Sequence, residues 1–223
     1  NGTFLAADGY RYSGSWQNGK ISGRGEVRYP DGSIYIGAFL NDLPEGVGKI
    51  TYPDGSTYEG NWKAGVIEGA GKATYPNGLV YEGSFKNAQN HGYGIMTFSD
   101  SYRYEGNWKD GKRHGAGQAR YRDGTTYVGG FVEGQRSGDG YIKMKDGFSY
   151  TGEWLDGEIH GFGTATYANG DVYTGSFVDG RRQGTGTMRY ATGGVERGTW
   201  DNGVLQPAED TAPAPGGAAG PSE

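Results

Sequence analysis

The chain has 223 residues and a formal net charge of −5; 46 of its residues are glycine and none is cysteine. The negative charge does not favour binding to nucleic acid or to an anionic membrane through bulk electrostatics. The lack of cysteine excludes a disulfide scaffold, a thiolate metal site and a cysteine nucleophile. No segment approaches the roughly 18 consecutive apolar residues of a membrane-spanning helix, and the compartment is not identified.

One pattern of glycine and aromatic residues recurs every 23 residues. It reads Tyr-x-Gly-x-Trp/Phe, then Gly-x-x-x-Gly-x-Gly, then a second Tyr and an Asp-Gly or Asn-Gly turn. The copies begin at Tyr12, Tyr35, Tyr58, Tyr81, Tyr104, Tyr127, Tyr150 and Tyr173. A regular period of this size indicates a repeat architecture, in which each unit buries its apolar side against its neighbours.

The pattern divides the chain into four parts. Residues 1–11 are expected to be the end of a truncated repeat, because Gly2 and Gly9 already fall in register, so a longer protein with any targeting signal upstream is expected. Residues 12–195 are eight full repeats, and 196–205 are a half-repeat that caps the array. Residues 206–223 are rich in Pro, Ala and Gly without aromatic residues, which predicts a disordered tail.

Each repeat is expected to form two short amphipathic strands. Tyr12, Gly14 and Trp16 have the period-2 spacing of one strand face, with polar or small residues between them. Asp-Gly and Asn-Gly pairs favour the positive φ of tight hairpin turns. The sequence therefore predicts an all-β fold, a continuous antiparallel meander of tandem hairpins with about seventeen strands, roughly 80 Å long at the usual strand spacing.

Three glycine columns recur in all eight repeats, at Gly14, Gly23, Gly25 and their equivalents. Glycine is a poor strand residue, so its recurrence suggests that an aromatic ring lies over the bare backbone. The aromatic residue at the fifth place alternates between Trp and Phe, as at Trp108 and Phe131. A later place in the second strand holds Ala or Val in Trp repeats and Ile or Met in Phe repeats, which suggests a large ring opposite a small side chain.

These residues resemble MORN (membrane occupation and recognition nexus) repeats over about residues 2–203. The resemblance implies an elongated, twisted, single-layer antiparallel sheet with one hairpin per repeat and an aromatic-lined groove. It also implies a scaffold role, binding of partner peptides, dimers through terminal repeats and affinity for phospholipids. The sequence departs from the pattern at a few positions, namely Asp42 and Ala88 in the loops, Ser101 in a turn, Met144 for the second Tyr, and Glu196 for the last leading Tyr.

The aromatic rows are the candidate ligand-binding residues, since contiguous exposed aromatic surface usually marks a contact site. They are also expected to supply the core of the fold by packing on one another. The predicted partner is a protein or a second copy of the chain, as a homodimer. The predicted ligand-binding residues are Tyr104, Trp108, Tyr127, Phe131, Tyr150, Trp154, Tyr173, Phe177 and Trp200.

Basic residues cluster in the loops of the C-terminal half, at Lys112, Arg113, Arg136, Arg181 and Arg182. If these loops share one edge, that edge favours anionic phospholipid headgroups. The alternative interpretation is an ordinary solvated edge, because acidic residues nearby dilute the field.

No catalytic residue, cofactor or metal site is predicted. His91, His114 and His160 occupy equivalent places, but equivalent places in adjacent repeats lie about 9–10 Å apart, too far for one zinc ion. The leading hypothesis is a non-catalytic interaction scaffold. The alternatives are a peripheral membrane module that binds anionic lipids, and an accessory domain of an enzyme encoded upstream.

Overall fold

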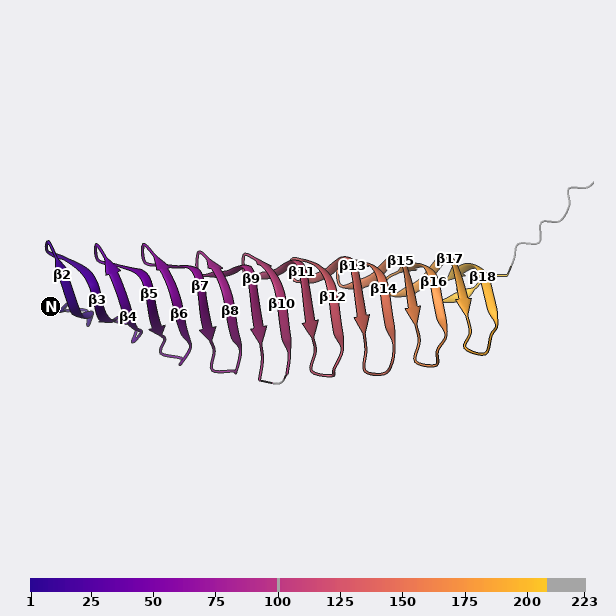
Figure 1. The fold of residues 1–223 in the computed structure, drawn as a ribbon, viewed down its shortest axis with the longest axis horizontal. Helices are drawn as coiled ribbons and strands as arrows, with labels where there is room; N and C mark the ends of the chain where they lie inside the picture. Colours follow the sequence, from indigo (N-terminus) through magenta and orange to yellow (C-terminus); the bar gives the residue numbers. More distant parts are fainter. Residues whose placement is uncertain (100, 208–223) are drawn as a thin grey trace, which may run out of the picture.

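The computed structural model describes residues 1–99 and 101–207, and these form one open antiparallel sheet of nineteen strands. Each strand pairs with the next along the chain, so the strands follow one another in the sheet from β1 to β19. Figure 1 shows β2 to β18 in this order along the sheet. The expected meander of hairpins is confirmed. The predicted strand number is too low, because the partial repeat before Tyr12 adds β1 and residues after Trp200 add β19.

The strands follow the repeat register with a seven-residue strand and a nine-residue strand in each repeat. In chain order they are β1 (Gly2–Leu5), β2 (Arg11–Gln17), β3 (Lys20–Arg28), β4 (Ile34–Leu40), β5 (Leu43–Thr51), β6 (Thr57–Lys63), β7 (Val66–Thr74), β8 (Val80–Lys86), β9 (Gln89–Thr97), β10 (Arg103–Lys109), β11 (Lys112–Arg120), β12 (Thr126–Val132), β13 (Gln135–Lys143), β14 (Ser149–Leu155), β15 (Glu158–Thr166), β16 (Val172–Val178), β17 (Arg181–Arg189), β18 (Val195–Asp201) and β19 (Val204–Leu205).

Two-residue turns join the strands within a repeat. Asn18 and Gly19 have φ of 54° and 79°, and Asp110 and Gly111 have φ of 49° and 80°. Positive φ at both central residues is the geometry of a type I′ turn, which matches the twist of the flanking strands. Longer turns join one repeat to the next, and there the Asp31 carboxylate accepts a hydrogen bond of 2.8 Å from the Ser33 N–H.

A bulge interrupts the pairing within each hairpin. Gly14 pairs with Gly25, but Trp16 pairs with Ile21, so β3 carries two more residues than β2 across this interval. Gly23 lies within the bulge at φ of 98°, in the left-handed region that favours glycine. This corrects the expectation for the Gly23 column, which meets a backbone requirement and does not lie under a ring.

The leading tyrosine of each repeat lies over the other two glycine columns. A β-carbon at Gly14 would lie 2.5 Å from Cα of Gly25, and one at Gly25 would lie 2.6 Å from the Tyr12 hydroxyl oxygen. The Tyr12 hydroxyl donates a 2.8 Å hydrogen bond to the carbonyl oxygen of Ser15. The predicted contact between a ring and bare backbone is therefore confirmed for Gly14 and Gly25, and the ring belongs to the leading tyrosine.

The leading tyrosines and the Trp or Phe residues form one continuous stack, which we call the ladder. Tyr12 contacts Trp16 and Phe39 edge to face, with both ring centroids at 5.4 Å, and Tyr35 then contacts Phe39 and Trp62 in the same way. The stack continues to Tyr173 and Trp200. Edge-to-face pairs at this distance are favourable beyond their burial, so the ladder supplies the core of a sheet that has one layer.

The prediction that a small side chain lies opposite each Trp ring is wrong. Ala119 pairs with Tyr104 on one side and with Tyr127 on the other, whereas Trp108 pairs with Arg113. The bulge shifts the register between Gly106 and Trp108, so the small residue does not lie opposite the indole ring. The Trp108 indole N–H reaches the preceding repeat, where it donates a 3.2 Å hydrogen bond to the Gly94 carbonyl oxygen.

Candidate interaction surface

The nine aromatic residues predicted to bind a ligand all belong to the ladder, and the structure buries them. Tyr104, Tyr127, Tyr150 and Tyr173 have no exposed surface, and Trp108, the most exposed of the nine, is 5% exposed. Burial at this level gives these rings a packing role in the monomer. Ligand binding by them stays a prediction.

A second aromatic row lies on the same face of the sheet, beside the turns that join the repeats. Nine of its eleven side chains are partly buried and pack against the core. Phe98 is also partly buried, Tyr75 is 41% exposed, and Met144 is the one member that is not aromatic. We call it the outer row. Its members are Tyr10, Tyr29, Tyr52, Tyr75, Phe98, Tyr102, Tyr121, Met144, Phe148, Tyr167 and Tyr190.

The sequence contains a signal for the outer row that the prediction did not use. The second Tyr of each repeat lies on the side of the second strand that faces the ladder. Tyr29, for example, comes two places after Val27, which is buried on that side. Alternate residues share a strand face. The position just beyond the strand end then explains why the ring remains partly exposed.

Two open pockets lie along the outer row in the C-terminal half. The first has a volume of about 780 Å³ and is lined by Phe98, Tyr102, Tyr121, Arg122 and Asp123. The second has a volume of about 750 Å³, and the residues that line it include Met144, Phe148, Tyr167, Arg182 and Tyr190. Pockets lined by aromatic side chains with a few polar groups are the usual form of a binding site.

Three of the five predicted lipid-binding residues turn onto the aromatic face. The guanidinium carbon of Arg113 lies 5.0 Å from the centroid of the Phe131 ring, that of Arg136 lies 5.0 Å from Trp154, and that of Arg182 lies 4.4 Å from Trp200. Stacking of a guanidinium on an aromatic ring is favourable and removes the charge from the solvated edge.

Hydrogen bonds fix two of these arginines across the ladder. Arg113 donates to the Tyr102 hydroxyl at 2.9 Å and to the Gly134 carbonyl oxygen at 2.6 Å. Arg136 donates to the Tyr121 hydroxyl at 3.2 Å. Arg113 and Arg136 therefore connect the loop side of the face to the outer row.

The other two basic residues stay at the loops. Lys112 forms a 2.7 Å ion pair with Glu133, and Arg181 donates a 3.2 Å hydrogen bond to the side-chain oxygen of Asn202. The five residues thus point in different directions and do not share one basic edge. Phospholipid binding stays a prediction.

The equivalent places in the first three repeats are aliphatic, since Ile21, Pro44 and Ile67 are buried there. The fourth repeat has Asn90, and the C-terminal half has three arginines and one isoleucine, namely Arg113, Arg136, Ile159 and Arg182. Since all the repeats share one backbone pattern, this difference in side chains gives the two halves of the aromatic face different chemistry. The C-terminal half offers cations beside its rings.

Burial changes the acidity of the ladder tyrosines. Desolvation raises the pKa of Tyr58, Tyr81 and Tyr104 to about 12, and the same cause acts on Tyr35, Tyr127 and Tyr150. These hydroxyls are therefore neutral near pH 7 and serve as hydrogen-bond donors to the backbone.

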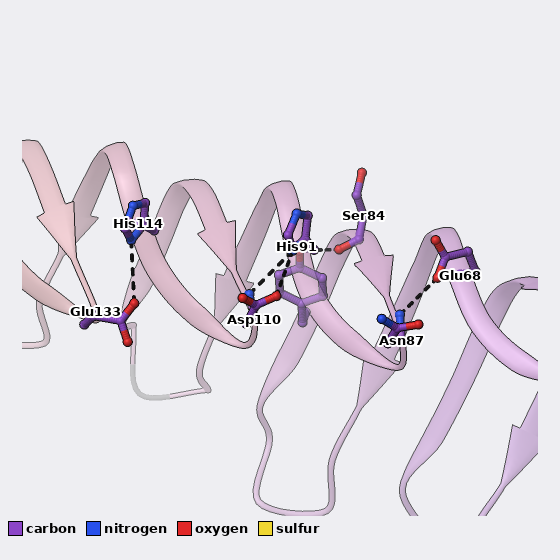
Figure 2. Close-up of polar contacts among 8 residues, drawn as sticks. Glu68, Ser84, Asn87, His91, Asp110, His114 and Glu133 are labelled. Carbon is purple, nitrogen blue, oxygen red and sulfur yellow. Dashed lines mark hydrogen bonds and ion pairs between the residues drawn. The ribbon is translucent and has the colours of Figure 1, made fainter.

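The three histidines lie in a column along the loops, and each faces an acidic residue of the next repeat. His91 Nδ1 lies 3.4 Å from an Asp110 carboxylate oxygen, and His114 Nδ1 lies 3.9 Å from Glu133 (Figure 2). In the preceding repeat Glu68 occupies the same place and accepts a 3.0 Å hydrogen bond from the Asn87 N–H. These contacts connect the third, fourth and fifth repeats to the turn of the repeat that follows each.

Neither the histidines nor the carboxylates assemble a metal centre in the described residues, 1–99 and 101–207, where no group of three or more possible ligands is close enough to hold an ion. Carboxylates of the opposite face lie beside lysines, as in the 3.8 Å ion pair of Lys49 and Glu59. The described part of the chain also has no helix that is long and apolar enough to cross a membrane.

The solved structures that match the chain include two TCP-type domains. The TCP domain of SAS-4 (dCPAP) from Drosophila melanogaster, solved with a proline-rich motif of Ana2 (dSTIL), is 12% identical, with 89% of this chain and 88% of that chain covered and a TM-score of 0.38. The TCP10 domain of Danio rerio CPAP, solved with a STIL peptide, is 12% identical, with 89% and 93% covered and a TM-score of 0.37. TM-scores this low do not support a shared site.

No curated protein matches the chain in sequence. The family model described as the MORN repeat matches eight consecutive segments, namely residues 12–34, 35–57, 58–80, 81–101, 104–126, 127–147, 150–172 and 173–195. These segments cover most of the chain and begin at the eight leading tyrosines. The chain therefore belongs to the MORN repeat family.

Proposed function

We propose that the chain is a non-catalytic interaction module that binds an extended segment of a protein partner along the outer row. The observation that carries this proposal is the row itself, a line of partly exposed aromatic side chains on a face whose ladder is fully packed. Tyrosine and phenylalanine supply large contact areas at low conformational cost, so they are common at the centres of interfaces.

The shape of the sheet favours an elongated ligand. The outer row follows the inter-repeat turns along the whole array, and its two pockets in the C-terminal half lie at successive turns. A segment that lies along the row would contact several repeats at once. The ladder beneath supports the row and supplies the rigidity that keeps the cost of binding low.

Fewer structural observations support the alternative roles. The arginines expected at a lipid-binding edge stack on rings, and Lys112 is paired with Glu133. Lipid binding, a homodimer through the terminal repeats and a role as the accessory domain of an upstream enzyme stay predictions.

Selection of peptides from a random displayed library tests the proposal. Peptides that bind the chain should lose most of their affinity when Tyr121→Ala and Tyr167→Ala are combined, because both rings line pockets of the outer row. Val128→Thr is the matched control, since Val128 is 49% exposed on the opposite face. Failure to select any peptide, or equal loss with the control variant, would contradict the proposed function.

A further inference from the structure

The two pockets of the outer row differ in the charges around them. Asp146 and Asp171 line the second pocket with Arg182, so its carboxylates outnumber its one cation. The lining of the first pocket contains Arg122 and Asp123 and is balanced by itself. What distinguishes the first pocket is the set of cations that lie just behind and beside its lining.

Arg113 and Arg136 bring unneutralised charge to the first pocket. Arg113 donates a hydrogen bond to the Tyr102 hydroxyl and Arg136 donates one to the Tyr121 hydroxyl, at 2.9 and 3.2 Å. In the described part of the chain their other side-chain contacts are also with neutral groups, namely aromatic rings and a backbone carbonyl oxygen. Since Tyr102 and Tyr121 line the pocket, both guanidinium groups make the electrostatic potential there more positive.

Two more cations lie at the turns of the same two repeats. Arg122 lines the first pocket, and Lys145 lines a smaller hollow of about 490 Å³ that shares Asp123 with it. At the places equivalent to Arg122 and Lys145 the other six repeats have Pro, Ser or Ala. The fifth and sixth repeats are therefore the two that carry one cation at the turn and a second one on the ladder.

The carboxylates beside the first pocket belong to the turns. Asp123 accepts a 2.9 Å hydrogen bond from the Thr125 N–H, and Asp146 accepts one of 2.9 Å from the Phe148 N–H. Hydrogen bonds from Thr125, together with the charge of Lys145, lower the pKa of Asp123. Among the described residues on this face, two carboxylates thus lie beside four cations, namely Arg113, Arg122, Arg136 and Lys145.

Tyr121 adds a hydrogen-bond donor for a ligand. Its hydroxyl oxygen accepts the hydrogen bond from Arg136. A tyrosine hydroxyl also has one hydrogen of its own to donate, and a bond from a cation to its oxygen polarises the group and strengthens that donor. Anionic oxygens form the strongest bonds with such donors, so the hydroxyl and the cations favour the same kind of ligand.

The net charge of the chain separates two classes of anionic ligand. A net charge of −5 repels an extended polyanion such as nucleic acid or an anionic membrane. The field of the four cations acts over about 10 Å at moderate salt, which is enough to attract a short acidic segment. The three rings of the pocket, those of Phe98, Tyr102 and Tyr121, favour an apolar side chain in the same ligand.

We propose that the first pocket binds an acidic segment of a partner protein, with one apolar side chain among the three rings and carboxylates beside Arg122 and Lys145. This inference rests on the proposed function and names the ligand class for one part of the outer row. The second pocket, where carboxylates outnumber the cation, does not share this preference.

Three labelled peptides test the inference by fluorescence anisotropy with the full chain. The first is Gly-Asp-Glu-Phe-Glu-Asp-Gly, the second has the amides Asn and Gln in place of the acidic residues, and the third has Ala in place of Phe. The first should bind at least ten-fold more tightly than either of the others. Its advantage over the second should shrink as the salt concentration rises.

Two protein variants locate the binding. Lys145→Gln and Arg136→Ile should each weaken the first peptide several-fold and leave the second nearly unchanged. Isoleucine already occupies the equivalent place at Ile159, so Arg136→Ile suits the packing of the ladder. Lys86→Gln is the matched control, because Lys86 is an exposed lysine at the loop end of β8, and it should change neither peptide. Unfolding midpoints verify that each variant is folded.

Similar binding of the first and second peptides would overturn the inference. So would a first peptide that does not bind, or one that Lys86→Gln weakens as much as Lys145→Gln does. If vesicles that contain phosphatidylserine bind through Lys145 and the first peptide does not bind, the surface is a lipid site and the assignment to a protein segment is overturned.

The inference and the proposed function fail separately. If library selection yields peptides that need Tyr121 but are neutral or basic, the proposed function stands and the acidic assignment falls. If the selection yields no peptide, the proposed function falls whatever the first labelled peptide does.

Discussion

The ladder and the outer row are two aromatic columns on one face of the same sheet, yet they differ in what surrounds them. Tyr127 in the ladder has no exposed surface, and its hydroxyl donates to the Gly130 carbonyl oxygen at 3.0 Å. Tyr75 in the outer row is 41% exposed. The difference comes from glycine, because a bare backbone lies under each ladder tyrosine.

This comparison separates stability from recognition. A ring that lies flat over two glycines and touches a second ring on each side can form the core of a single-layer sheet. A ring at the strand end keeps one side free for a partner. Mutations should therefore separate the two columns, and the largest effect is expected where the glycines under the ladder are filled.

The substitution Gly106→Val should destabilise the fold by about 3 kcal/mol or more, in line with the cost of overpacking. A β-carbon at Gly106 would lie 2.5 Å from Cα of Gly117 and 2.7 Å from the Ala116 carbonyl oxygen, and backbone atoms cannot move aside easily. Intrinsic strand propensity alone predicts a gain instead.

Urea unfolding midpoints measure the loss at Gly106. The matched control is Ala116→Val, because Ala116 is exposed on the opposite face and Val47 occupies the equivalent place in another repeat. The control should change the stability by less than about 0.5 kcal/mol. An unchanged midpoint for Gly106→Val would mean that the ladder tolerates a side chain beneath the ring.

Alkaline pH should unfold the sheet, because it ionises the ladder tyrosines. Burial raises the pKa of Tyr58, Tyr81 and Tyr104 from 10.0 to about 12. Because the folded pKa exceeds the unfolded one, the stabilisation is fully present below pH 10 and is lost as the pH rises through 12. Circular dichroism during an alkaline titration should show cooperative unfolding in this window, and a fold unchanged at pH 12 would contradict the burial of the ladder hydroxyls.

Removal of a single tyrosine hydroxyl should cost more stability in the ladder than in the outer row. Tyr58→Phe deletes the 3.0 Å hydrogen bond to the Asn61 carbonyl oxygen and should cost about 1 kcal/mol. Tyr75→Phe removes an exposed hydroxyl of the outer row and should cost much less. Thermal unfolding of the two variants gives the comparison, and equal losses would count against the distinction between the columns.

The smallest effect is expected at the loops, outside both columns. Ala88 has φ of 61° where Gly111 has φ of 80° in the next repeat, and the left-handed region costs a residue with a β-carbon about 1 kcal/mol. Ala88→Gly should therefore stabilise the fold by up to about 1 kcal/mol and Gly111→Ala should destabilise it similarly. Chemical denaturation tests both, and the same sign for the two would contradict the turn geometry.

Much of the fold follows from the sequence because the repeat fixes strand register and turn type together. The pairing of a leading tyrosine with bare glycine was predictable from their shared strand face. The bulge was not, since Gly23 resembles the other recurring glycines until its φ is known. This shift placed Arg113 opposite Trp108, whereas loop position alone suggested a solvated basic edge.

The candidate site was less predictable than the fold. The aromatic content pointed to the right face but to the buried column, because the pattern does not show that the ladder rings are fully covered by their neighbours. The second Tyr of each repeat falls on the ladder-facing side of its strand, but it is partly exposed because the strand ends just before it. The predicted tail from 208 onward lies outside the described residues.

The most direct test compares Tyr127→Ala in the ladder with Tyr121→Ala in the outer row. For each variant, both the unfolding midpoint and the affinity for a selected peptide are measured. Tyr127→Ala should cost about 3 kcal/mol or more of stability. Tyr121→Ala should cost about 1 kcal/mol and should weaken the peptide at least ten-fold. Equal losses of stability, or a peptide affinity that Tyr121→Ala leaves unchanged, would contradict the division of the face into a packed core and a binding row.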